Sequence, residues 1–252
     1  MIYPVKTQVN KLLFIVGLHI GFALSSNHLY AQKTISHTNQ QWIHSYQQYA
    51  VSEKINLLFD VGYRMKESFS EPRQFIVRSG IAYSILPNLR IAAGIAYADY
   101  FQASKLTEIE YRFFQDIQTV QQLMDKFKIE HRLRVEERFI HQTDEQNDQR
   151  YSWRFRYKLG GDIRLFRFST HSFSLYLGNE LFINAGKHIV YNIFDQNRLV
   201  TGISLHWSKN LNSSLLYNYQ FSAENKPGSY KATDILWLSI NSKLNLKAKR
   251  RS

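Results

Sequence analysis

The chain of 252 residues contains no Cys, only 4 Pro and 11 Gly, and no apolar run long enough for a membrane-spanning helix. The absence of Cys excludes disulfides, thiolate nucleophiles, thiolate zinc sites and iron–sulfur clusters. Low Pro and Gly contents exclude collagen-like and low-complexity chains. With 17 Phe, 16 Tyr and 4 Trp, the chain is too aromatic for intrinsic disorder. Its length predicts one folded domain, or at most two.

The first 31 residues have the pattern of a secretory signal peptide. Lys6 and Lys11 precede an apolar run that ends at Leu24, and small and polar residues then lead to Ala31. A basic start, a short apolar core and a small residue at the cleavage site are typical of exported proteins. An N-terminal core helix is the alternative interpretation. The predicted organisation is a signal peptide over 1–31, a folded region over 32–246 and a basic tail over 247–252.

Apolar and polar residues alternate through the remaining chain with a period of two. Over residues 54–66 the apolar set is Ile55, Leu57, Phe59, Val61, Tyr63 and Met65. On a helix these side chains would scatter around the whole circumference, whereas on a strand they share one face. Residues 127–140 repeat the pattern, with one apolar face and one almost entirely charged face. Both segments are therefore predicted to be strands.

The same alternation predicts about eleven long strands. They lie near residues 40–50, 54–66, 73–85, 89–101, 106–119, 127–140, 150–165, 172–184, 198–208, 211–222 and 233–246. Strands of globular proteins are mostly about 5 or 6 residues long, whereas strands that cross a membrane need roughly 9 to 11 residues and more to reach past it. The pattern therefore predicts an all-β fold, an antiparallel transmembrane β-barrel.

The links between these strands alternate in length. The links at 51–53, 86–88 and 209–210 are short, whereas those at 141–149, 185–197 and 223–232 are long. Outer-membrane barrels have short periplasmic turns and longer outer loops. If both chain ends are periplasmic, the strand number must be even. We therefore expect about twelve strands (10 to 12), with an additional strand inside 33–38.

The charged parity is predicted to line the barrel interior, because lipid cannot accommodate a row of charges. The candidate lining residues are Glu108, Glu110, Arg112, Glu130, Arg132, Arg134, Glu136, Arg138, Arg154, Arg156, Glu180 and Arg198. Asp60, Arg64, Arg78 and Asp116 share this parity. Basic residues outnumber acidic ones, which favours anions if a water-filled path exists. The expected role is therefore structural, with Arg and Glu pairs that fill the lumen as a plug, or that of a narrow pore or binding barrel with a preference for anions.

Several short motifs resemble one family of proteins. Trp42 lies in the first clear strand, and the chain continues with EIEYRFFQ from Glu108, EHRLRVEERF from Glu130, GNELFIN from Gly178 and FDQNR from Phe194. In this order the motifs resemble a family of uncharacterised outer-membrane β-barrels, the domain of unknown function 2490, found in Gram-negative bacteria. The resemblance implies an outer-membrane barrel and no established activity. The basic residues after Leu246 depart from the terminal aromatic residue that the barrel assembly machinery recognises in many such proteins.

Two alternative functions are an outer-membrane lipid hydrolase and a soluble lipid-binding barrel. Ser204 and His206 lie two residues apart, but on the inward parity, which is wrong for attack on a lipid from outside. A soluble barrel would need an apolar lumen, which this number of aromatic rings would overfill. We therefore expect no enzyme.

The remaining expectations concern cofactors and partners. No metal-binding or phosphate-binding motif occurs, and Thr143 to Glu145 with Asp148 are interpreted as a solvated loop, so no cofactor or metal is expected. The basic residues alternate into the interior, so no nucleic-acid partner is expected. The expected partners are outer-membrane lipid, the barrel assembly machinery and a small anionic solute, with the protein as a monomer.

Overall fold

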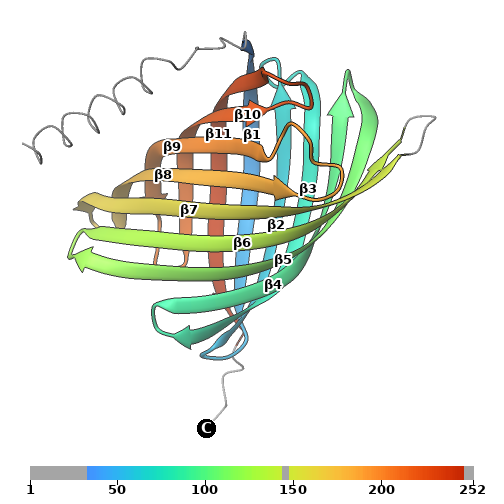
Figure 1. Ribbon diagram of the computed structural model, residues 1–252. Helices are drawn as coiled ribbons and strands as arrows, with labels where there is room; N and C mark the ends of the chain where they lie inside the picture. Colours follow the sequence, from blue (N-terminus) through green and yellow to red (C-terminus); the bar gives the residue numbers. More distant parts are fainter. Residues whose placement is uncertain (1–32, 144–147, 247–252) are drawn as a thin grey trace, which may run out of the picture. The chain divides into compact units, whose positions relative to one another are not determined.

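A computed structural model describes residues 33–143 and 148–246. This part of the chain forms eleven strands that close into a barrel (Figure 1). The strands are β1 (Thr34–Ala50), β2 (Ile55–Lys66), β3 (Glu71–Leu86), β4 (Leu89–Gln102), β5 (Lys105–Met124), β6 (Phe127–Gln142), β7 (Gln149–Phe168), β8 (His171–Ala185), β9 (Phe194–His206), β10 (Leu211–Ala223) and β11 (Ser229–Asn245). The predicted all-β barrel is confirmed, and each strand predicted from the alternation is present.

The barrel has eleven strands, within the expected range of 10 to 12, and the additional strand expected inside 33–38 is absent from the described residues. Thr34 to Asn39 extend β1 and pair only with β11, because the pairing of β1 with β2 begins at Gln40. This segment contains no turn that would reverse the chain, so it cannot form a separate strand. The predicted boundaries of the signal peptide and the basic tail concern residues 1–31 and 247–252, which lie outside the described residues.

An odd number of strands requires one parallel pair to close the barrel. All neighbours are antiparallel except β1 and β11, which pair in parallel from Thr34 and Ser229 to Ala50 and Asn245. Consequently Thr34 lies at one end of the barrel and Asn245 at the other. The expectation that both ends of the chain lie on the same side is therefore wrong for the described residues.

Aromatic rings contact one another across the parallel seam. Trp42 of β1 lies opposite Trp237 of β11, with ring centroids 5.4 Å apart in an edge-on arrangement. The ring of His44 also contacts that of Trp237, with the ring centroids 5.4 Å apart. Aromatic pairs across strands stabilise a sheet beyond the area that they bury. This aromatic contact adds to the hydrogen bonds that close the barrel.

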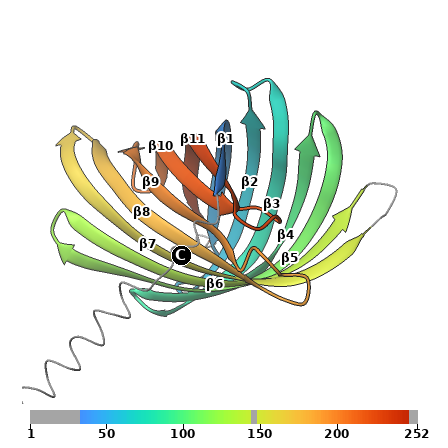
Figure 2. The same ribbon diagram turned by 45° about the horizontal axis from the view of Figure 1, so that its top comes forward.

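The two ends of the barrel differ in their connections. At one end, here called the turn end, the connections 87–88, 125–126 and 169–170 have two residues each, and β1 to β2 and β9 to β10 have short links. At the other end, the loop end, lie the longer connections after β6, β8 and β10. Figure 2 shows the strands curving into a wall between these ends. No helix in the described ranges is long and apolar enough to cross a membrane.

The outward face is apolar, as the alternation predicts. Ile81, Ile95, Leu133 and Ile203 are among the side chains that are more than half exposed, and the even-numbered neighbours along the same strands point inward. Tyr63, Tyr83, Tyr151 and Trp207 are also exposed, nearer the ends of their strands. One strand therefore presents opposite chemistry on its two faces.

Three acidic residues share the outward parity, and each accepts a hydrogen bond from a tyrosine. Tyr97 donates to Asp99 at 2.5 Å, Tyr151 donates to Glu137 at 3.1 Å, and Tyr217 donates to Asp234. Asp99 and Glu137 lie within five residues of the loop end of their strands. Outward acids thus occur where a strand approaches its end and where a phenol hydroxyl can satisfy them.

The turn between β4 and β5 is strained and offers a test of the backbone geometry. Ala103 and Ser104 have φ values of 47° and 60°, the left-handed region that a two-residue type I′ hairpin needs. Replacement by Asn-Gly should stabilise the barrel by about 1 kcal/mol, because these residues tolerate that region better. Urea unfolding in detergent followed by tryptophan fluorescence measures the change.

A matched control is the two-residue turn at Asp125 and Lys126, neither of which has a positive φ. Asn-Gly should give no gain there. An equal gain at both turns would contradict the argument from backbone strain.

Candidate functional site

The candidate site is a cavity of about 770 Å³ inside the barrel. Inward-facing residues of all eleven strands line it. The lining includes twelve Lys or Arg residues, namely Arg64, Arg73, Arg78, Arg90, Arg112, Arg132, Arg134, Arg138, Arg154, Arg156, Lys158 and Arg198. It includes six acids, namely Asp60, Asp116, Glu130, Asp162, Glu180 and Asp195. Basic groups are therefore in excess on the cavity wall.

The structure places most of the sequence-predicted candidates on this wall. Nine of the twelve line the cavity: Arg112, Glu130, Arg132, Arg134, Arg138, Arg154, Arg156, Glu180 and Arg198. Glu110 and Glu136 are fully buried beside the arginines that they neutralise. Glu108 lies nearer the loop end, where its carboxylate is 3.4 Å from the guanidinium of Arg150.

Glu110 of β5 is the acceptor for a first group of ion pairs. It receives hydrogen bonds from Arg112 Nε at 2.6 Å and from Arg138 Nε at 2.5 Å. The hydroxyl of Tyr100 donates to the same carboxylate at 2.9 Å. The side chain of Glu110 has no exposed surface. Burial of the charged Glu110 carboxylate without partners would be strongly unfavourable. Two guanidinium groups and one phenol hydroxyl donate the hydrogen bonds that stabilise it here.

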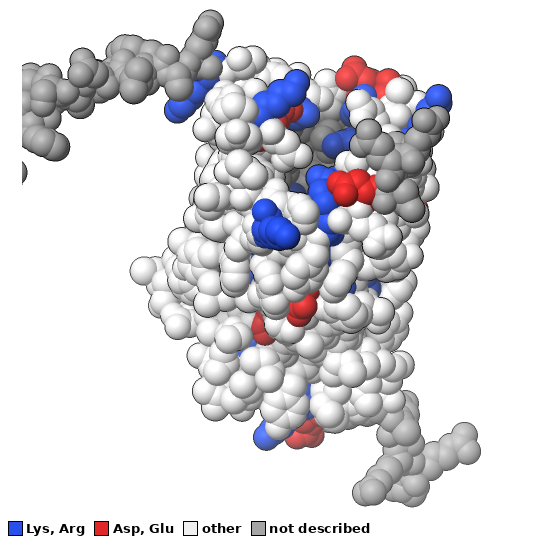
Figure 3. Space-filling view, turned by 45° about the vertical axis from the view of Figure 1, so that its right-hand side comes forward, with Lys and Arg blue, Asp and Glu red and all other residues white. Residues whose placement is uncertain are grey.

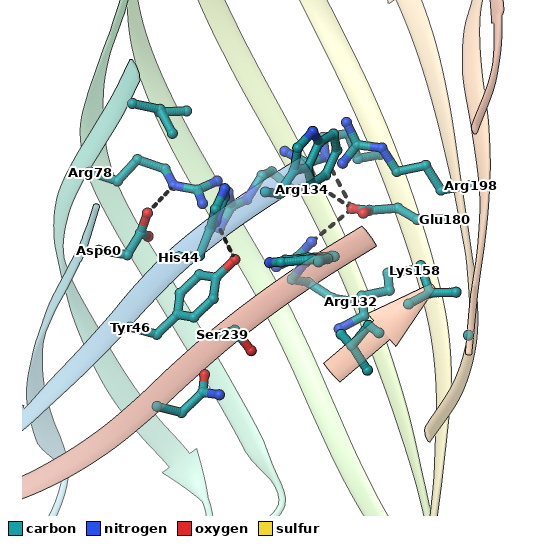
Figure 4. A pocket seen from close by; sticks show the side chains of 18 of the residues that line it. His44, Tyr46, Asp60, Arg78, Arg132, Arg134, Lys158, Glu180, Arg198 and Ser239 are labelled. Carbon is teal, nitrogen blue, oxygen red and sulfur yellow. Dashed lines mark hydrogen bonds and ion pairs between the residues drawn. The ribbon is translucent and has the colours of Figure 1, made fainter. Parts of the chain in front are cut away.

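A second group of ion pairs crosses β6, β7 and β8. Glu136 accepts from Arg154 Nε and from Arg156 Nη1, both at 2.7 Å. Arg156 Nη2 also donates to Glu180 at 2.7 Å, and Arg132 donates to the same Glu180 oxygen at 2.7 Å. Figure 4 shows Arg132 and Glu180 pointing toward each other in the cavity. The carboxylates therefore hold neighbouring arginines in fixed positions.

Among the described residues, the part of the cavity wall formed by β1, β10 and β11 carries no acid and no Lys or Arg. The cavity residues from β1, β10 and β11 are amides, hydroxyls and aromatic rings, including Gln40, Trp42, His44, Gln220 and Trp237. His44 Nδ1 lies 2.8 Å from the hydroxyl of Tyr46, and Trp42 Nε1 donates to Gln40 at 2.8 Å. The interior is thus asymmetric, with ion pairs on one side and uncharged polar groups on the other.

A second cavity of about 510 Å³ lies at the turn end. It shares only Gln48, Arg90 and Gln118 with the first cavity. Arg90 Nη2 donates to Gln118 across β4 and β5, and Gln48 belongs to β1. The two cavities therefore meet at these three residues, here called the junction.

Ser204 and His206 do not contact each other. The Ser204 hydroxyl lies 2.8 Å from the Ser214 hydroxyl, whereas His206 Nε2 lies 3.0 Å from Ser174 Oγ. Ser174 donates to Asp162 at 2.8 Å, so its proton points away from the histidine. A histidine activates a serine nucleophile by accepting the proton of its hydroxyl. This arrangement lacks that contact.

Sequence reasoning missed the uncharged wall and the junction of the two cavities. Trp42, Gln48 and Gln118 carried no charge pattern that would single them out. Their inward parity is visible in the alternation of β1 and β5, which was the signal available. Their proximity depends on barrel closure, which joins strands distant in the sequence.

The fold and the cavity define a class of protein, a closed β-barrel with an apolar exterior and a polar interior. Within that class, a family model described as protein of unknown function (DUF2490) matches residues 39–231. The chain belongs to this family, which confirms the resemblance of its motifs. A search of curated protein sequences gives no match.

Three solved structures are similar to the chain at low identity. One is described as a bacterial polysaccharide outer membrane secretin, with 12% identity and a TM-score of 0.39 over 70% of this chain and 71% of that chain. A NanC porin has 10% identity and a TM-score of 0.45 over 71% of this chain and 85% of that one. The ferric enterobactin receptor of Pseudomonas aeruginosa has 8% identity and a TM-score of 0.30 over 68% of this chain and 35% of that one.

Proposed function

We propose that the protein is an outer-membrane β-barrel that binds and passes small anions through its interior. The observation that carries the proposal is the excess of basic over acidic side chains on the cavity wall. Even when the buried Glu110 and Glu136 are added to the six lining acids, the twelve basic residues remain in excess. A basic wall lowers the barrier for negative solutes and raises it for positive ones.

The outer surface supports a location in a membrane. The strands contain 12 to 20 residues, more than the roughly 9 to 11 that a tilted strand needs to cross the hydrocarbon. In the space-filling view most of the face shown is free of charged residues, and charged side chains gather toward its upper end with a few elsewhere (Figure 3). An export signal over residues 1–31 would deliver such a chain to the outer membrane of a Gram-negative bacterium.

The geometry favours this function over the alternatives. A soluble lipid-binding barrel needs an apolar interior, whereas this interior contains ion pairs, amides and hydroxyl groups. The hydrolase interpretation loses its Ser204 and His206 pair, because these residues have other partners. A complete plug is not supported, because a cavity of about 770 Å³ remains beside the ion pairs.

Single-channel recording tests the proposal. The chain is refolded in detergent, a heat-dependent gel shift establishes that the barrel has formed, and the protein is added to a planar bilayer. We expect discrete current steps and, in a KCl gradient, a reversal potential displaced toward the equilibrium potential of chloride. A folded barrel that passes no current, or that prefers potassium, would overturn the proposal.

The junction of the two cavities predicts a residue that affects the current. Gln48→Trp should reduce the conductance by about twofold or more, because a large ring would narrow the region in which the two cavities share their lining residues. Tyr49→Trp is the matched control, since Tyr49 is the next residue of β1 and lines neither cavity. Equal currents from the two variants would place the limiting region elsewhere.

A further inference from the structure

Two arginines from distant strands meet at one tryptophan ring on the uncharged wall. The guanidinium carbon of Arg64, from β2, lies 3.9 Å from the centroid of the Trp42 ring. The guanidinium carbon of Arg198, from β9, lies 5.1 Å from the same centroid. Both side chains line the main cavity. Two positive charges therefore lie close together although 133 residues separate them in the sequence.

These two arginines differ from the arginines of the ion-pair groups. Among the described residues, neither Arg64 nor Arg198 has an ion pair with an acid, and Nε of Arg64 is buried with no hydrogen-bond partner. Arg198 Nε donates to the neutral side-chain oxygen of Gln220 at 2.9 Å. Stacking on Trp42 offsets only part of the unfavourable burial of two like charges. A fold that needed only stability would not require this arrangement.

The surroundings supply further donors, and the two acids whose charges act on Arg198 are paired with other arginines: Glu180 with Arg132 and Arg156, and Asp195 with Arg154. Trp42, Gln40 and Trp237 line this side of the cavity, and the buried Nε1 of Trp237 has no hydrogen-bond partner within the described part of the chain. The rings of Trp42 and Trp237 are 5.4 Å apart. Phe182 holds the Arg198 guanidinium from another side, with its centroid 4.6 Å from the guanidinium carbon. The two cationic groups are thus held in place by rings and not by carboxylates.

We propose that Arg64 and Arg198, held against Trp42, bind a small oxyanion, a carboxylate or a phosphate. The inference rests on the proposed function, because the anion has to reach the cavity. The planar guanidinium group presents paired N–H donors whose spacing matches two oxygens of a carboxylate or phosphate. Two such groups without acidic partners provide both the charge and the donors that such an anion needs. This site selects solutes inside the broader anion-attracting interior.

Calorimetric titration of the refolded full chain in neutral detergent at low ionic strength tests the site. Inorganic phosphate and acetate are the two probes, and their comparison distinguishes a phosphate ligand from a carboxylate ligand. Arg64→Gln and Arg198→Gln should each weaken binding of the preferred probe by roughly tenfold or more, because each removes a charge-assisted pair of hydrogen bonds. Arg64→Lys should bind the probe more weakly than the wild type, since a lysine keeps the positive charge but lacks the paired N–H donors of the guanidinium group.

Arg73→Gln is the matched control. Arg73 lines the same cavity, and its replacement by Gln removes the same charge. It lies near the loop end, however, and donates to the carbonyl oxygen of Phe101 at 3.0 Å. The affinity of the Arg73→Gln variant for the probe should differ from that of the wild type by less than about twofold. Failure to bind either probe, or equal weakening in all three glutamine variants, would overturn the site.

Binding and conduction are measured separately so that the two proposals can fail separately. Suppose that phosphate or acetate binds, that the Arg64 and Arg198 variants no longer bind it, and that the folded barrel passes no current. The proposed anion site is then supported and the proposed pore function is wrong. If the barrel conducts anions while both variants bind the probe as tightly as the wild type, the proposed pore function is supported and the proposed anion site is wrong. Both variants should fold, because neither leaves an acid without its partner.

Discussion

Glu136→Gln should destabilise the barrel by about 3 to 5 kcal/mol, the loss expected when one partner of a buried ion pair is removed. The Glu136 side chain is only 2% exposed and accepts hydrogen bonds from Arg154 and Arg156. Arg134 Nη1, from the same strand, lies 3.8 Å from Glu136 Oε1. A neutral amide would remove the carboxylate that these three guanidinium groups share, and Arg154 would retain only Asp195, at 3.3 Å, as an ion-pair partner. Urea unfolding in lipid vesicles, followed by the heat-dependent gel shift, measures the change.

Glu137→Gln is the control for this prediction. Glu137 is the next residue of β6, so the change in chemistry and in net charge is the same. Its carboxylate faces outward and accepts one hydrogen bond, from Tyr151. A single exposed contact of this kind contributes little, so the midpoint of unfolding should hardly move. Equal destabilisation by both variants would show that the inward and outward sides of β6 are assigned wrongly.

The strands and their faces could be predicted from the sequence because both are local properties. Each residue of β6 changes sides relative to its neighbour, so the contrast between Leu133 and Arg134 is enough to assign the period. Tertiary contacts do not override this pattern, since charged inward side chains find partners in the interior, whereas most outward side chains are apolar. This is why the predicted strands needed correction mainly at their ends.

The alternation gives the eleven strands, but it could not decide whether a twelfth strand exists, because closure of the barrel is a non-local property. Whether residues 34–39 form a new strand or extend β1 depends on their register with β11, almost 200 residues away. The assumption that both ends of the chain lie on one side then imposed an even number. The parallel pair of β1 and β11 removes that requirement.

The candidate site was predictable only as a set of charges, not as pairs. Asp116 and Arg134 are direct cross-strand neighbours, a relation that hairpin register can suggest. Arg132 and Glu180, in contrast, meet across an intervening strand, β7. Arg64 and Arg198 meet at Trp42 only because the barrel closes. Alternation along one strand carries no information on such contacts, which depend on barrel curvature and side-chain length.

Ile203→Arg should prevent stable assembly in lipid, whereas Ser204→Arg should be tolerated. Ile203 is 52% exposed on the outer face, opposite Leu175 of β8 and Leu215 of β10. An arginine that faces the middle of a bilayer destabilises a barrel by about 2 to 4 kcal/mol, and the effect falls toward the interfaces. Ser204, the next residue, lines the cavity, where a guanidinium group can remain hydrated. The measurement is the folded fraction in vesicles and its urea midpoint.

This pair of variants separates membrane contact from packing, because the same side chain is introduced one residue apart. If the outer face were exposed to water, Ile203→Arg would be harmless, since an exposed arginine on a strand is readily solvated. If the outer face contacts lipid, the variant should lose stability in vesicles and recover part of it in detergent micelles, where the head group can reach water more easily. Loss of folding by Ser204→Arg alone would require an apolar interior, which is incompatible with the cavity described above. The outcome therefore decides which side of the barrel wall is in contact with the membrane.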